Sequence, residues 1–177
     1  AGGFRPISEK DLFDCEYWSL EQAKLGKGAP PKFQGKIVMI TGGSGTIGFA
    51  LAKAFSKLGA QTILVDKDEI ALEESVAKLG VGHKYFPIDV THSDAANQAM
   101  LAAINNFGGL DILISNAGAA HAGPMLGISN EELRNAFELN FFSHYSFSTE
   151  AAKILKDQNR GGQILFNISK QAVNPGK

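Results

Sequence analysis

The chain has 177 residues, 44% of them hydrophobic, and its formal charge is −1 at pH 7. It can build one sizeable core, and without a stripe of basic residues interleaved with aromatic ones it does not resemble a nucleic-acid-binding protein. The single cysteine, Cys15, excludes an internal disulfide, and the sequence shows neither a signal-like segment nor an apolar run long enough to span a bilayer. We therefore expect a cytoplasmic location, with no nucleic-acid or membrane partner.

Residues 1–34 differ from the rest and are predicted to form an N-terminal linker or arm. They carry Tyr17 and Trp18 among acidic residues, and they end in a run of Gly, Lys, Ala and Pro. Residues 19–25 can form a short helix, which the Pro30–Pro31 pair ends. We interpret the two aromatic residues as anchors that pack the arm onto a domain, with a binding box as the alternative.

From residue 35 onward strand and helix patterns alternate, which predicts an α/β fold, a Rossmann-like doubly wound parallel sheet. Strands are expected near residues 37–40, 62–65, 84–88, 110–115 and 163–168, and helices near residues 47–58, 69–79, 94–107 and 130–156. Ser129 and Glu132 have the spacing of a capping box, which predicts the start of the last helix. The sheet is expected to be truncated after about its fifth strand.

The first predicted strand runs into the glycine-rich turn of residues 41–48 and then into a helical pattern. Gly43, Gly45 and Gly48 satisfy G-x-G-x-x-G, whereas Gly42, Gly45 and Gly48 give the alternative G-x-x-G-x-x-G spacing. Such a turn exposes amide groups at a helix N-terminus to a pyrophosphate, and glycine lets the phosphates approach the backbone. This interpretation requires that the protein's own side chains do not occupy those amides. The alternative is a glycine turn without a ligand.

Asp66 ends the second predicted strand, 18 positions after Gly48. A carboxylate there can accept hydrogen bonds from the adenosine ribose and repels a 2′-phosphate, which favours NAD over NADP. The neighbouring Lys67 weakens this preference because a cation tolerates a phosphate. The alternative role for Asp66 is a helix N-cap or an exposed turn residue. We predict NAD as the cofactor and residues 35–177 as the NAD-binding domain.

Polar and small residues also follow the other predicted strands, where ligands of a doubly wound sheet bind. They are Asp89 and Val90 after the third strand, Asn116, Ala117 and Gly118 after the fourth, and Ser169 with Lys170 after the fifth. Asp89 either flanks an adenine ring or forms a plain Asx turn. Asn116 can brace the neighbouring strand end, and the small residues beside it let the backbone approach a cofactor.

Taken in order, these motifs resemble the short-chain dehydrogenase/reductase family from about Lys36 to the last residue. The motifs are the Thr-Gly-rich turn, the acidic end of strand two, Asp-Val, Asn-Ala-Gly, Leu-Asn on the long helix and Asn-Ile-Ser on strand five. The resemblance implies that Thr41, Gly42, Ser44, Thr46, Ile47 and Gly48 surround the pyrophosphate, together with Gly43 and Gly45 of the glycine pattern. It likewise places Asp66 at the ribose, Asp89 and Val90 beside adenine, and Asn116, Ala117 and Gly118 on the nicotinamide side.

The resemblance implies two catalytic residues. Ser169 would polarise the substrate oxygen, and Asn140 would open the long helix to hold a water of a proton relay. The alternative for Asn140 is a surface or kink residue, because asparagine is a poor residue in the middle of a helix.

The sequence departs from the family pattern at three places. Thr46 stands where the middle glycine is commonest, and Lys170 stands where a second serine often carries catalysis, so we assign Ser169. The family's Tyr-x-x-x-Lys pair does not occur, and Tyr145 does not replace it, because Thr149 is four residues on. The complete enzyme is expected to carry the pair beyond Lys177, and these 177 residues alone are expected to be inactive.

The front arm and the tail of the chain resemble a narrower group, the dehydrogenase half of bifunctional rhamnulose-1-phosphate aldolase/lactaldehyde (alcohol) dehydrogenase proteins. This resemblance implies a fragment with an aldolase domain in the same full-length chain. It also implies oxidation or reduction of a small hydroxyaldehyde or alcohol, such as lactaldehyde in rhamnose catabolism. Two alternatives stay open: a non-catalytic dinucleotide-binding module, and a sugar-nucleotide epimerase or dehydratase, which the G-x-x-G-x-x-G spacing favours.

Two further expectations concern metals and partners. The spacing of the four histidines is not that of a metal site, so no metal is expected; they are His83, His92, His121 and His144. His121 follows Asn-Ala-Gly and either contacts the substrate or is simply exposed to solvent. Phe141, Phe142, Tyr145 and Phe147 are too clustered to face one core. They predict a homo-oligomer packed through the helix at residues 130–156, with a hydrophobic pocket wall as the alternative.

Overall fold

The computed structural model describes residues 8–13, 30–120 and 126–170. The chain divides into two compact units, Ala1–Lys32 and Phe33–Lys177. The described part of the first unit includes a short helix over residues 9–13. Cys15, Tyr17, Trp18 and the helix predicted over residues 19–25 lie outside the described residues. Within the described ranges, no helix combines the length and the hydropathy that crossing a membrane requires.

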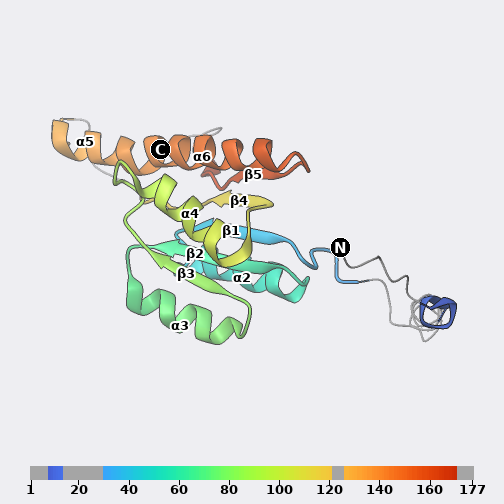
Figure 1. Ribbon diagram of the computed structural model, residues 1–177. Helices are drawn as coiled ribbons and strands as arrows, with labels where there is room; N and C mark the ends of the chain where they lie inside the picture. The colour runs from blue at the N-terminus through green and yellow to red at the C-terminus, as the bar shows by residue number, and fades with distance from the viewer. Residues whose placement is uncertain (1–7, 14–29, 121–125, 171–177) are drawn as a thin grey trace. The chain divides into compact units, whose positions relative to one another are not determined.

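The second unit is built on one five-stranded parallel sheet, which confirms the predicted α/β class (Figure 1). Its strands are β1 (Ile37–Thr41), β2 (Gln61–Asp66), β3 (Lys84–Pro87), β4 (Ile112–Ser115) and β5 (Gln163–Phe166). Their order is β3-β2-β1-β4-β5. From β1 the chain adds β2 and β3 on one side, and it then returns to add β4 and β5 on the other side of β1. In such sheets the ligand crevice lies where the order reverses, outside the carboxyl ends of the strands. Here those ends belong to β1 and β4.

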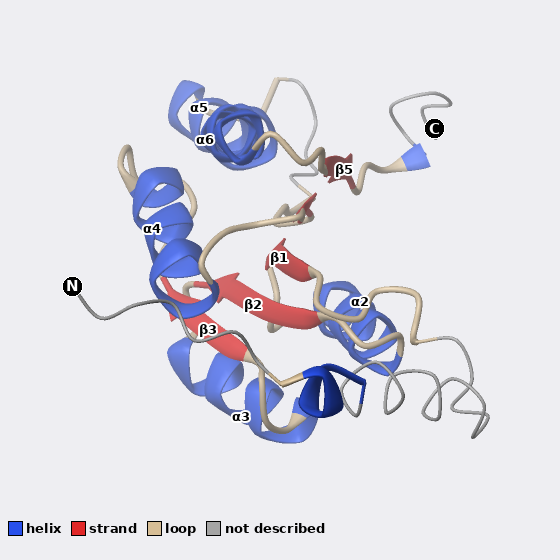
Figure 2. Cartoon of the chain, turned by 45° about the vertical axis from the view of Figure 1, so that its right-hand side comes forward, coloured by secondary structure: helices blue, strands red, loops and turns tan. Residues whose placement is uncertain are grey.

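Helices cover both faces of the sheet (Figures 1 and 2). On one face lie α2 (Thr46–Lys57) and α3 (Glu69–Leu79), and on the other lie α4 (Ala95–Phe107) and α6 (Ser143–Gln158). Successive side chains of a strand point to opposite faces. Accordingly Met39 packs in the core with α4 and α6, whereas Val38 and Ile40 pack in the core with α2 and α3.

The helix predicted over residues 130–156 is present but is not uniform. It consists of α5 (Asn130–Phe137), the π-helical turn η1 (Glu138–Phe142) and α6. The predicted capping box is formed, because Ser129 Oγ accepts from Glu132 N and the Glu132 side chain accepts from Ser129 N. Of the clustered aromatic residues, Phe147 is 1% exposed in the core, while Phe141, Phe142 and Tyr145 are exposed. The cluster is therefore divided between an inner and an outer side.

Two amide side chains tie this long helix to the backbone on both sides of β4. Near the end of α6, Gln158 Nε2 donates to Leu110 O at 2.6 Å, and Leu110 N donates to Gln158 Oε1 at 2.9 Å. In η1, Asn140 Nδ2 donates to Ala119 O at 2.9 Å, and Ala119 N donates to Asn140 Oδ1 at 3.1 Å. The part of the helix from Asn140 to Gln158 therefore runs antiparallel to β4 and is tied to the backbone at both of its ends.

Candidate functional site

Three glycines of the turn after β1 are explained by the packing of the turn itself. Gly42 has φ +64°, in the left-handed region that favours glycine, and a Cβ there would lie 3.0 Å from Asn116 Nδ2. A Cβ on Gly43 would lie 2.7 Å from Leu64 Cβ, and one on Gly48 would collide with the carbonyl oxygen of Gly42. These positions bring the turn, β2 and α2 close together.

Gly45 is different, because the chain's own packing does not require glycine there. Its φ of −69° suits any residue, and a Cβ would touch only Gly42 O, at an ordinary 3.4 Å. The space in front of Gly45 is thus open, and it lies at the residue that precedes α2. A cradle of this kind, which a side chain would fill, fits the approach of a phosphate to the backbone.

The N-terminus of α2 offers hydrogen-bond donors to such an anion. The amides of Thr46, Ile47 and Gly48 belong to the first turn, which has no intrahelical partner. No side chain caps the helix at Gly45, and the first turn contains no acidic residue. Thr46 and Ile47 are exposed. No side chain therefore occupies the first amides of α2, as the anion-binding interpretation requires. The positive end of the helix dipole also favours an anion there.

Asp66 faces this turn and occupies one donor just before the helix. Its Oδ2 accepts from Ser44 N at 3.2 Å and from Ser44 Oγ at 2.7 Å, while its Oδ1 accepts from Lys67 N at 2.8 Å. The Ser44 amide is therefore already bonded, unlike those of the helix. The alternative of a helix N-cap is not realised, because Asp68 caps α3 through Ala71 N.

The ends of β1, β4 and β5 are joined by a chain of hydrogen bonds. Thr41 Oγ1 accepts from Asn116 N at 2.9 Å and from Ala117 N at 3.0 Å. Asn116 Nδ2 donates to Thr41 O at 2.9 Å, and Asn167 Nδ2 donates to Asn116 Oδ1 at 2.8 Å. Asn116 thus braces the strand ends as predicted. Thr41, 2% exposed, uses its hydroxyl to hold β4 and not to face a ligand.

After β3, Asp89 adopts the Asx-turn alternative. Its Oδ1 accepts from Thr91 N at 2.9 Å and from Thr91 Oγ1 at 2.7 Å. The backbone hydrogen bond from Thr91 lowers the pKa of Asp89 against the opposing effect of burial. Val90 is buried in the core on the α4 side. A contact of either residue with adenine stays a prediction.

The two residues predicted to be catalytic lie at the same edge of the sheet. Asn140 sits in the π turn η1, where it clasps Ala119, and a Cβ on Gly118 would lie 3.0 Å from its Oδ1. Ser169 is exposed and follows β5, with Lys170 next in the chain. His121 lies outside the described residues. Within the described ranges, no group of acidic, histidine or cysteine side chains is arranged to hold a metal ion.

The sequence analysis missed a pair of polar side chains beside this edge, the buried Ser115 and the half-buried His144. Ser115 Oγ lies 2.6 Å from His144 Nδ1, and the His144 ring packs against Phe166 with centroids 6.1 Å apart. Burial lowers the pKa of His144, and a hydrogen bond to the backbone of Ala117 opposes this shift in part. No local pattern signals this pair, because its two members lie 29 positions apart in the sequence.

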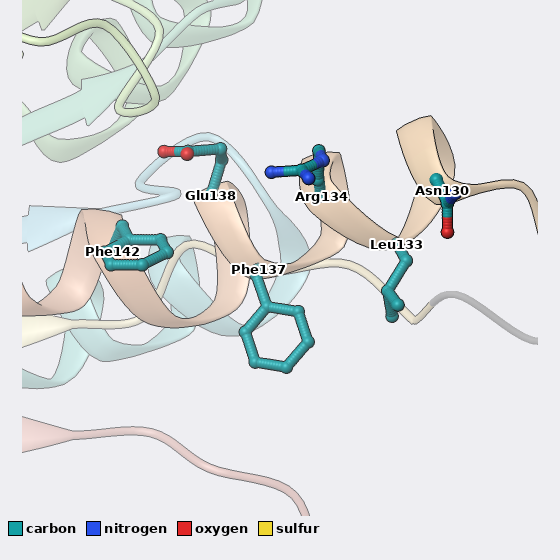
Figure 3. Close-up of a pocket in the computed structure, with 6 residues that line it drawn as sticks. All are labelled: Asn130, Leu133, Arg134, Phe137, Glu138 and Phe142. Carbon is teal, nitrogen blue, oxygen red and sulfur yellow. The ribbon is translucent and has the colours of Figure 1, made fainter.

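A shallow hollow of about 280 Å³ lies beside α5 and η1, and Figure 3 labels the residues that line it. It is lined by Asn130, Leu133, Arg134, Phe137, Glu138 and Phe142. None of the residues predicted to bind the cofactor or to act in catalysis is among them. The hollow is therefore separate from the candidate site.

Two protein families match the chain. The model of the short chain dehydrogenase family matches residues 36–177, and the model of the second domain of class II aldolases matches residues 1–25. Among curated proteins, the chain is 33% identical to the oxidoreductase YuxG of Bacillus subtilis, over 99% of this chain and 26% of that protein. It is 30% identical to galactitol 2-dehydrogenase of Agrobacterium fabrum, over 82% of this chain and 57% of that enzyme. The chain thus spans about half the length, or less, of these relatives.

Solved structures share the fold. One is a 3-ketoacyl-(acyl-carrier-protein) reductase from Brucella melitensis complexed with NADH, with a TM-score of 0.79 and 27% identity over 82% of this chain and 62% of that one. Another is L-sorbose reductase from Gluconobacter frateurii complexed with NADPH and L-sorbose, with a TM-score of 0.79 and 28% identity over 84% of this chain and 57% of that one. Neighbours of the same fold therefore bind either nicotinamide cofactor.

Proposed function

The chain belongs to the short-chain dehydrogenase family, and from this premise we propose that the complete protein is an NAD-dependent oxidoreductase acting on a small hydroxyaldehyde or alcohol. The observation that carries the proposal is the open N-terminus of α2 with the Asp66 carboxylate beside it. Backbone donors at a helix N-terminus suit a pyrophosphate, and a carboxylate at the end of the next strand suits a ribose diol.

The residues present fit the two halves of the cofactor at separate places. The turn from Gly42 to Gly48 would hold the pyrophosphate, Asp66 the adenosine ribose, and the segment from Asn116 to Gly118 the nicotinamide side. When bound, the nicotinamide supplies or accepts a hydride. The protein contributes orientation, through the bonds that Thr41 and Asn167 make to the Asn116–Gly118 segment.

Proton handling is proposed to involve Ser169 and Asn140. The Ser169 hydroxyl would donate a hydrogen bond to the substrate oxygen as charge develops on it. Asn140 lies in a π turn, a form of helix that is frequent at functional sites, and its side chain holds Ala119 at the rim of the site. A Tyr-x-x-x-Lys pair following Lys177 in the complete protein is proposed to supply the acid and base.

The choice of NAD over NADP rests on the charge of Asp66. Neighbours of this fold carry NADH or NADPH, so the fold itself does not decide the cofactor. The carboxylate accepts from both the amide and the hydroxyl of Ser44, which holds its charge where a 2′-phosphate of NADP would approach. Lys67, the next residue, carries the opposite charge and would weaken this preference for NAD.

The proposed substrate is lactaldehyde or a related hydroxyaldehyde from deoxysugar breakdown. Its support is the match of residues 1–25 to an aldolase domain and the similarity to YuxG, which extends over 99% of this chain and 26% of that protein. Galactitol 2-dehydrogenase and L-sorbose reductase, by their names, act on a polyol and a sugar. An aldolase domain in the same polypeptide would release the aldehyde on which the dehydrogenase acts.

The test uses the protein extended to its natural ends. NADH and NADPH are titrated by fluorescence, and turnover is followed with NAD and lactaldehyde. Asp66→Asn removes the charge and keeps one oxygen that can accept from Ser44, while the bond from Lys67 N is lost. We expect the ratio of NADPH to NADH affinity to rise about tenfold, the equivalent of about 1.4 kcal/mol. Glu69→Gln, an exposed acid three positions on, is the matched control. Binding of neither cofactor contradicts the proposal; binding without turnover favours a non-catalytic dinucleotide-binding module.

We also propose that a second copy of the chain packs on the outer side of η1 and α6. The support is the exposure of Phe141, Phe142 and Tyr145, three large apolar side chains within five residues. Light scattering on the Phe141→Glu and Tyr145→Glu variants should show a smaller particle than the unmodified protein. An unchanged mass in both variants would count against this interface.

A further inference from the structure

The segment that follows β4 is anchored from three directions. Thr41 on β1 accepts from its amides, and Asn167 beyond β5 donates to Asn116. The long helix supplies the third direction, through Asn140 on Ala119 and His144 on Ser115. The Ser115–His144 contact stands at the start of this segment, and the Asn140 clasp stands at its end.

Ser115 connects β4 to its neighbours by two different groups. Its carbonyl oxygen accepts from Asn167 N at 3.0 Å, and its hydroxyl meets His144 Nδ1 at 2.6 Å. Ser115 is 1% exposed, so water does not replace a lost partner easily. The buried hydroxyl therefore depends on the His144 ring.

The Ser115–His144 contact lies just after the π turn η1, where it bears on the rotation of α6 about its axis. A π turn adds a residue and changes the direction in which every later side chain points. Ser143 Oγ donates back to Leu139 O at 2.6 Å, within the same helix. Among the described residues, His144 is the first side chain after η1 that bonds to the sheet. It fixes the rotation of α6 where the π turn ends.

The elements that pack against α6 bring few titratable groups near the His144 ring. The ranges of α4, β4 and β5, which pack against α6, contain no Asp, Glu, Lys, Arg or Tyr. Glu138 lies in η1, and the nearest titratable groups along α6 are Tyr145 and Glu150. Burial lowers the pKa of His144, and a hydrogen bond to the backbone of Ala117 opposes this shift in part. In the neutral ring that carries its proton on Nε2, Nδ1 accepts from the Ser115 hydroxyl.

We propose that Ser115 and His144 form a positioning pair for the nicotinamide half of the cofactor. Their hydrogen bond holds the Asn116–Gly118 segment between the sheet and α6, while the adenosine half depends on the glycine turn and Asp66, which the pair does not touch. This inference rests on the proposed function. It separates two ligands: NADH uses both halves of the site, and ADP-ribose, which lacks the nicotinamide, uses one.

The experiment measures the dissociation constants of NADH and ADP-ribose on the protein extended to its natural ends. His144→Phe keeps a ring beside Phe166 and removes the acceptor; Ser115→Ala removes the donor; His144→Asn places an amide oxygen near the position of Nδ1. Lys156→Gln, at an exposed position of α6, is the control. We expect a five- to tenfold loss of NADH affinity in the first two variants, as for one buried hydrogen bond. ADP-ribose affinity should stay within about twofold, and His144→Asn should restore NADH binding.

A pH series adds a readout that a merely structural role would not change. Protonation of His144 puts a charge on the half-buried ring and turns Nδ1 from an acceptor into a donor, so the hydrogen bond with Ser115 must reverse. NADH should therefore lose affinity relative to ADP-ribose as the pH falls below the pKa of His144 in wild type but not in His144→Asn. Equal weakening of both ligands in His144→Phe and Ser115→Ala, or unchanged NADH binding, overturns the inference. A wild type that binds no NADH refutes the proposed function as well. Wild-type binding with unaffected variants refutes only the positioning pair.

Discussion

Replacing Gly45 with alanine should separate cofactor binding from folding. The backbone at Gly45 has φ −69° and ψ 162°, which alanine adopts without strain, and the new Cβ would make an ordinary contact of 3.4 Å with Gly42 O. Fewer unfolded conformations favour alanine by about 0.4–1 kcal/mol. The poorer helix N-cap costs about as much. We therefore expect a free energy of unfolding within about 1 kcal/mol of wild type.

The same methyl group would cover the open space in front of the first turn of α2. One charge-assisted hydrogen bond from a backbone amide to the pyrophosphate would be lost, and such a bond contributes about 1.5–3 kcal/mol. With 1.4 kcal/mol for each factor of ten, we expect NADH to bind about 10- to 100-fold more weakly. The measurements are NADH fluorescence titration and urea unfolding of the same preparation.

Gly48→Ala is the matched control with the opposite expectation. Its Cβ would collide with the backbone of Gly42, which has no flexible end to move aside, so the turn must open. We expect a loss of stability of about 1–3 kcal/mol or more, as for an overpacked core. If Gly45→Ala stays folded and binds NADH within about twofold of wild type, the cradle reasoning is refuted.

Three further predictions concern stability. Asp111 is buried and accepts from Ile37 N at 3.0 Å and from Lys36 Nζ at 2.9 Å, and these bonds hold its pKa low against the effect of burial. Asp111→Ala should lower the free energy of unfolding, measured in urea, by about 1–3 kcal/mol. Lys36→Met should lower it clearly less, because Lys36 is half exposed. Burial lowers the pKa of His83 from its ordinary 6.5, so the unfolded chain takes up the proton first: stability should be complete above pH 6.5 and fall below it, with a shallower fall in His83→Gln. An equal slope in both proteins would exclude His83 as the source. Ser129→Ala removes the capping box, worth about 1 kcal/mol; because α5 buries none of its residues, hydrogen exchange should accelerate in α5 while global unfolding barely changes.

The sequence was sufficient where a local pattern determines the outcome. Alternating apolar runs predicted the five strands, the Ser129–Glu132 spacing predicted the start of α5, and the motifs at the strand ends predicted which residues gather at one edge of the sheet. These features depend on side-chain periodicity and on caps, both of which lie within a few residues of each other.

The sequence was insufficient where a feature depends on a residue far away along the chain. The predicted long helix contains a π turn held by the clasp between Asn140 and Ala119, and the Ser115–His144 pair joins residues 29 positions apart. The hydroxyl of Thr41 serves β4, 75 positions away. The division of the aromatic cluster, with Phe147 inside and its neighbours outside, follows from how α6 meets the sheet.

The hydrogen-bond pairs made by Gln158 and Asn140 couple the length of helix between them to the length of backbone that includes β4. The clasped helix positions are 18 residues apart, or about 27 Å. Their partners, Leu110 and Ala119, are nine residues apart on the backbone that includes β4. One inserted residue within α6 would rotate one end by about 100° and release a clasp. Insertions that the loops tolerate should therefore be rejected between these two anchors.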